Sequence, residues 1–113
     1  MHPSFAHEIE ERFLRYVRID TTSCEASSTV PSTEKQLDLQ RVLESELHEI
    51  GASDIHLTPN GYLLATIPKT VTDREVPVVC LLAHVDTVEA FSGTDVVPII
   101  YRNYDGKPIV LPR

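Results

Sequence analysis

An apolar run over residues 76–83 constrains the fold of this chain more than any other feature. It reads Val-Pro-Val-Val-Cys-Leu-Leu-Ala, so its apolar side chains do not alternate with polar ones. A strand with this pattern is typically covered on both faces, as in layered α/β domains. Pro77 stands near the start of the run, where its missing N–H matters least to a ladder. We therefore predict a buried strand at 76–83 in an α/β domain.

Two amphipathic helices are predicted before this strand. Over residues 3–17 the apolar side chains recur every four positions, and the acidic and basic side chains of the opposite face are expected to contact solvent. Pro3 and Ser4 both mark its start. The second helix covers residues 33–50. Thr33 and Gln36 match a capping box at its start, and Gly51 follows at the position of a left-handed C-cap.

The remaining strand signals come in two pairs. Residues 55–57 and 62–67 flank Pro-Asn-Gly, which predicts a hairpin. Residues 96–101 and 109–111 flank the turn sequence Asn-Tyr-Asp-Gly at 103–106, which predicts a second pair of strands. We therefore expect two helices followed by a mixed sheet. Between the helices, residues 20–32 form a polar loop that is long for a connector, and loops of that length are often functional or mobile.

Composition excludes several classes of protein. With 113 residues the chain has room for one domain, and a net charge of −7 argues against a binder of nucleic-acid phosphates. No apolar run approaches the roughly 20 residues of a membrane span, and the N-terminus lacks the pattern of a signal peptide. Two cysteines, Cys24 and Cys80, are too few and too far apart for a disulfide scaffold. These features indicate a cytoplasmic domain with reduced thiols, in which Cys80 is a buried core residue.

His84 and Asp86 are the strongest candidates for chemistry. They follow the apolar run, and the ends of strands in open α/β sheets are where ligands bind. Side chains two residues apart on an extended backbone point to the same side. An imidazole is a good metal ligand, and a carboxylate bonded to its other nitrogen fixes the tautomer and raises the basicity of the ligand. By itself His-x-Asp is a weak pattern. The other histidines are interpreted as surface residues: His2, His7, His48 and His56.

Five segments of the chain carry a resemblance to a known family. One is the run that ends in Ala-His-Val-Asp-Thr at 83–87, and it is followed by Phe-Ser-Gly at 91–93 and Asn-Tyr-Asp-Gly at 103–106. Upstream lie Arg-Tyr-Val-Arg-Ile-Asp-Thr-Thr-Ser at 15–23 and Asn-Gly-Tyr at 60–62. Together these segments resemble the peptidase T family, which comprises cytosolic tripeptide aminopeptidases within a larger group of zinc-dependent exopeptidases. The run at 83–87 is typical of the larger group, the segments at 91–93 and 103–106 indicate the peptidase T branch, and the upstream segments resemble its N-terminal region. The resemblance covers nearly the whole chain.

This resemblance implies a three-layer catalytic domain that holds two zinc ions. His84 matches the first zinc ligand of the family, and Asp86 matches the aspartate that orients this ligand. The bridging aspartate, the glutamate base and the remaining ligands of the family lie downstream of the matched region. Glu89 does not occupy the position of the base. Because a zinc site needs three or four ligands, we expect residues 1–113 to be the N-terminal part of a longer peptidase, inactive alone.

Two other functions stay open. The chain could belong to a related zinc dipeptidase or deacylase, or it could be a free-standing binding domain that has lost the chemistry. In either peptidase interpretation one face of the sheet lacks its cover, and we expect a homodimer through the exposed apolar surface. The substrate implied by the resemblance is a tripeptide.

Overall fold

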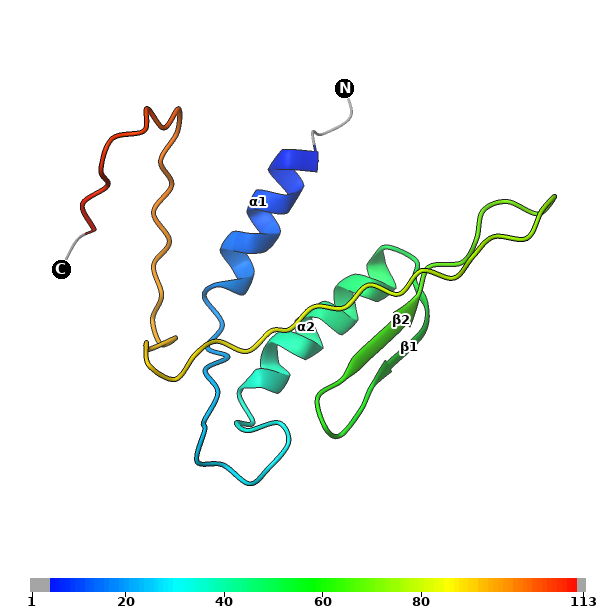
Figure 1. Cartoon of the computed structure of the whole chain (residues 1–113), viewed down its shortest axis with the longest axis horizontal. Coiled ribbons are helices and arrows are strands. Elements are labelled where there is room, and N and C mark those ends of the chain that lie inside the picture. The colour runs from blue at the N-terminus through cyan, green and yellow to red at the C-terminus, as the bar shows by residue number, and fades with distance from the viewer. Residues whose placement is uncertain (1–4, 112–113) are drawn as a thin grey trace.

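The computed structural model describes residues 5–111 and contains two helices followed by a two-stranded sheet (Figure 1). This order confirms the predicted α/β arrangement. The expected helix start at Pro3 and Ser4 lies outside the described residues, as does His2. The element bounds are α1 Phe5–Tyr16, α2 Gln36–Glu49, β1 Ser53–Leu57 and β2 Leu63–Thr66.

The C-terminus of α2 ends as the sequence predicts. Gly51 has a φ of +80°, in the left-handed region that glycine enters without a steric penalty. Its N–H donates to the carbonyl of His48 at 3.1 Å, and the N–H of Ala52 donates to the carbonyl of Leu47 at 3.0 Å. These two bonds satisfy carbonyls that the last turn of a helix otherwise leaves unpaired.

The capping box predicted at the start of α2 is wrong. Lys35 is the N-cap residue, and its side chain makes no capping bond. The hydroxyl of Thr33 donates instead to the carbonyl of Thr22 at 2.8 Å, and the amide of Gln36 donates to the hydroxyl of Ser32 at 3.0 Å. Both side chains therefore bond to the preceding loop instead of to the first backbone N–H groups of α2, because these loop partners compete successfully with the cap.

The hairpin prediction is confirmed. β1 and β2 are antiparallel, with Ser53 opposite Thr66 and Leu57 opposite Leu63, and a register shift lies between these pairs. The hairpin packs against α2, and the Gln40 amide of that helix donates to the carbonyl of Gly61 in the turn at 2.9 Å. The sheet contains these two strands alone within residues 5–111, so the expected mixed sheet is not formed there.

Helix α1 is joined to α2 through charge, which corrects the prediction of a fully solvated charged face. Glu46 of α2 is buried and accepts hydrogen bonds from Arg12, Arg15 and Tyr16 of α1. Burial alone would raise the pKa of Glu46, but the bonds from Tyr16 and Arg15 and the charges of both arginines lower it below its ordinary value. The apolar stripe of α1 stays largely exposed, with Phe5 at 83%.

The other three predicted strands do not form. Residues 76–83, 96–101 and 109–111 are extended, and they make no ladder within the described chain (Figure 1). Val78 and Leu82 are 97% and 96% exposed, and Cys80 is exposed rather than buried. A strand needs a hydrogen-bonded neighbour, and the β1–β2 hairpin does not supply one to this run. Leu39 of α2 is the one buried apolar residue among residues 5–111.

Within the described part of the chain, neither helix combines the length and the apolar character that crossing a bilayer requires.

Candidate functional site

His84 and Asp86 face each other across a short contact. The His84 Nδ1 atom lies 2.9 Å from the Asp86 Oδ1 atom, the distance of a hydrogen bond. With a proton on Nδ1, the imidazole donates to the carboxylate and keeps the lone pair of Nε2 for another partner. The side chain of His84 is 84% exposed and that of Asp86 is 46% exposed. The pair therefore has the geometry of a ligand and its orienting carboxylate.

The polar loop after α1 holds the chain around this pair. The hydroxyl of Thr21 donates to the carbonyl of Val85 at 2.8 Å, and the N–H of Thr87 donates to the carbonyl of Thr21 at 3.2 Å. Both the N–H and the hydroxyl of Ser23 donate to the carbonyl of Thr87 at 2.9 Å. Thr22 and Thr87 form an isolated parallel bridge. Residues 21–23 thus act as a short strand-like neighbour of residues 85–87.

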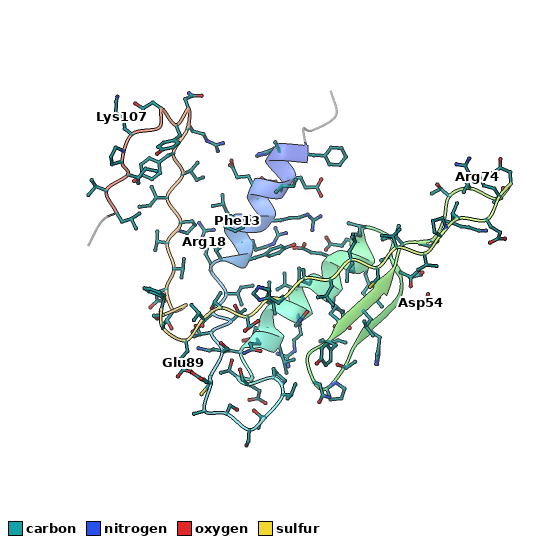
Figure 2. The ribbon with its side chains drawn as sticks, viewed as in Figure 1. Phe13, Arg18, Asp54, Arg74, Glu89 and Lys107 are labelled. Carbon is teal, nitrogen blue, oxygen red and sulfur yellow. The ribbon has the colours of Figure 1, made fainter. Side chains whose placement is uncertain are left out.

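A second contact joins the same two stretches farther along. Glu89, at the edge of the molecule beside the polar loop in Figure 2, accepts the N–H of Glu25 at 2.7 Å through its Oε2 atom. The carboxylate of Glu89 therefore has a structural partner.

Asp20, the first residue of this loop, is the centre of a polar cluster that joins the loop to Lys35, Gly93 and Thr94. Its Oδ1 atom accepts the hydroxyl of Thr22 at 2.6 Å and the N–H of Thr22 at 2.9 Å. Its Oδ2 atom accepts Lys35 Nζ at 2.9 Å and the hydroxyl of Thr94 at 3.0 Å. The N–H of Gly93 completes the cluster by donating to Thr22 Oγ1 at 3.2 Å. These donors, the Thr22 hydroxyl first among them, hold the pKa of Asp20 far below its ordinary value.

A cleft of about 710 Å³ lies beside the candidate pair. It is bounded by α2, by β2 and the preceding turn, and by residues 80–86. Leu43 and Leu47 line it from α2, and Leu63 lines it from β2. His84 and Asp86 are also among its lining residues, so the candidate pair contributes polar groups to a largely apolar cleft.

A complete metal site is not formed by the described residues. Residues 5–111 contain no group of three or more histidine, cysteine, aspartate or glutamate side chains that could hold an ion together. His7, His48 and His56 are exposed, as predicted. Both cysteines are free thiols in the described chain. The donor chemistry of His84 fits one position of a zinc site, and further ligands would have to come from outside this stretch.

The residues that hold the pair carry no predicted role in the sequence. Asp20, Thr21 and Thr22 are visible there as part of a long polar loop and of the family motif at 15–23, and nothing singles out Thr94. Thr21 and Thr22 are 3% and 9% exposed, which is unusual for threonine in a loop. The available signal was the run Asp-Thr-Thr-Ser itself, since short hydroxyl and carboxylate side chains hydrogen-bond readily to nearby backbone.

Comparison with known proteins agrees with this picture. No protein-family model matches the chain. The proteins named peptidase T from Bacillus cereus strains B4264 and G9842 are each 48% identical to it over 104 residues. Peptidase T from Bacillus thuringiensis strain Al Hakam is 47% identical over the same length. This chain is related to peptidase T.

The match covers 92% of this chain and 25% of each of these peptidase T sequences. Two helices and a small sheet thus correspond to about a quarter of the length of these relatives. The relationship confirms the resemblance found in the motifs. The roles of His84 and Asp86 stay predictions, because the comparison concerns the chain as a whole.

Proposed function

We propose that this chain is the N-terminal part of a longer, cytoplasmic aminopeptidase that uses two zinc ions to remove the N-terminal residue from tripeptides. The observation that carries the proposal is the 2.9 Å contact between His84 Nδ1 and Asp86 Oδ1, in a chain that is 48% identical to peptidase T. A tripeptide is the substrate class that the family resemblance implies. The complete peptidase would have the three-layer catalytic domain of that family.

In the longer peptidase His84 would supply one zinc ligand through Nε2. Asp86 would hold the Nδ1 proton, keep the imidazole in the ligating tautomer and raise its basicity. When bound, zinc supplies positive charge that polarises the scissile carbonyl and lowers the pKa of a water. Residues 21–23 would fix the backbone on both sides of the pair, so that the imidazole stays turned toward the metal.

We expect the 113-residue chain to show no tripeptide turnover by itself, because one imidazole and one orienting carboxylate cannot supply the three protein ligands of a catalytic zinc site. The longer peptidase, loaded with zinc, should release the N-terminal residue of a tripeptide. An amine-detecting assay on both purified proteins measures the difference, with a dipeptide and an N-acylated amino acid as comparison substrates. Turnover by the short chain would contradict the proposal. Preference of the longer peptidase for either comparison substrate would favour a dipeptidase or a deacylase.

We also propose that the 113-residue chain forms a homodimer through residues 76–83. Val78, Leu81 and Leu82 are each more than 90% exposed, and their backbone has no ladder partner in the described chain. Leu82→Lys is expected to shift the chain to monomer, whereas Ile67→Lys, on an apolar residue that is also exposed, should not. Sedimentation velocity over a range of concentrations measures this. A wild-type chain that stays monomeric at high concentration would contradict the dimer.

A further inference from the structure

Thr21 contacts the backbone on both sides of Asp86. The peptide that precedes Asp86 is held at its carbonyl, because Val85 O accepts the Thr21 hydroxyl at 2.8 Å. The peptide that follows Asp86 is held at its N–H, because Thr87 N donates to Thr21 O at 3.2 Å. One residue therefore restrains both peptide planes that flank Asp86. Those two planes fix the direction in which the Asp86 Cβ points.

Side-chain packing does not fix the candidate pair. The side chains of His84 and Asp86 are 84% and 46% exposed, whereas Thr21 is 3% exposed. An exposed pair loses rotamer entropy when it is held in one geometry, and such pairs contribute little by themselves. The buried Thr21, through its bonds to the backbone of Val85 and Thr87, restrains the backbone that carries the exposed pair.

We propose that Thr21 is the positioning residue of the His84–Asp86 pair. Its hydroxyl sets the conformation of the Val85 carbonyl, and through it the orientation of the Asp86 carboxylate that holds the Nδ1 proton of His84. Ser23 supports the same segment from the next position, since its N–H and hydroxyl both donate to Thr87 O at 2.9 Å. The importance of this positioning for catalysis rests on the proposed function.

The test measures the tautomer of His84 in the full 113-residue chain by nitrogen-15 NMR, without metal and at a pH where imidazole is neutral. In the wild-type chain the major form should carry its proton on Nδ1. Thr21→Val keeps the β-branched shape and removes the hydroxyl. It should shift the population toward the Nε2-protonated form, in the direction of the shift given by Asp86→Asn.

Two further variants separate positioning from a general effect on folding. Thr21→Ser keeps the hydroxyl and should restore the wild-type tautomer. Thr29→Val removes another hydroxyl bond to a carbonyl, from Thr29 Oγ1 to Pro31 O at 2.9 Å in the same loop, and should leave the tautomer unchanged. An unchanged tautomer in a folded Thr21→Val chain would overturn the proposal. So would an equal shift in Thr29→Val.

If Thr21→Val failed to fold, Ser23→Ala would decide the matter, because it removes only a hydroxyl bond to Thr87 O. It should shift the tautomer in the same direction by a smaller amount, and no shift would overturn the proposal. In the longer peptidase, Thr21→Val should lower zinc affinity by about 10-fold, the lower end for partners of metal ligands. Two results are read together here: the His84 tautomer in Thr21→Val and the zinc affinity of His84→Ala. A shifted tautomer in the first variant with unchanged zinc affinity in the second would uphold the positioning role of Thr21 and refute the proposed ligand role of His84.

Discussion

Replacing His84 with alanine should remove zinc-dependent tripeptide hydrolysis from the longer peptidase. The substitution deletes the imidazole whose Nε2 atom is left free by the bond from Nδ1 to Asp86. Losing a ligand should exceed the roughly 10- to 100-fold loss in metal affinity or activity that follows removal of a ligand's outer partner. The measurement is kcat/KM for a tripeptide, together with the zinc content of the dialysed protein.

Two further variants serve as comparisons for His84→Ala: Asp86→Asn, with an intermediate expected loss, and His56→Ala, with none. The first substitution keeps the size of the side chain and removes its charge, so the loss should fall within about 10- to 100-fold and should lie mainly in metal affinity. His56 is an exposed histidine on β1, and its replacement should change neither zinc content nor turnover. A His84→Ala protein with wild-type zinc content and kcat/KM would refute the ligand role.

The second large effect is expected from Gly93→Ala. A Cβ at this position would lie 2.7 Å from both Asp20 Oδ1 and Thr22 Oγ1, closer than real contacts allow. Neither oxygen can move freely, because Asp20 also accepts Lys35 and Thr94. We expect the free energy of unfolding to fall by about 1–3 kcal/mol, as for other crowded sites, or the segment around residue 93 to detach.

Urea unfolding measures the stability change, and hydrogen exchange at the Thr22 and Gly93 amides, compared with the same amides of the wild-type chain, measures detachment. Gly51→Ala is the matched control. It meets nothing within 4 Å, and its cost arises only from the left-handed φ of +80°. Gly51→Ala should therefore leave the exchange of Thr22 unchanged. If Gly93→Ala kept the wild-type stability and the wild-type exchange rates, the prediction would be wrong, and the side chains of Asp20 and Thr22 would be free to move away from the added Cβ.

Local signals predicted the elements that residues near in sequence can build. The hairpin needs only its own turn and two short strands, and the end of α2 needs only Gly51 and the carbonyls behind it. The contact between His84 and Asp86 follows from two-residue spacing on an extended backbone. In each case the contact forms inside one local motif, a turn with its two strands, a helix end or a two-residue spacing, so the residues that make the pattern also make the contact.

Signals that depend on distant partners were misread or missed. The apolar run at 76–83 indicates a strand covered on both faces, and nothing in residues 5–111 covers or pairs it. Thr33 looks like a cap, but its hydroxyl reaches Thr22 eleven residues earlier. The links from Asp20 to Thr94 and from Thr21 to Val85 span more than sixty residues. Sequence pattern shows that such side chains need partners and does not say which ones.

The cluster around Glu46 selects one longitudinal position for α1. Its three donors, Arg12, Arg15 and Tyr16, lie on one face of that helix, so a slide of α1 by one turn would leave at most one of them at the carboxylate. The buried carboxylate would then lose most of its partners, which is unfavourable. Apolar contact is non-directional and would tolerate several such positions. Because Asp20 follows only four residues after Tyr16, the register of α1 also determines where the polar loop begins.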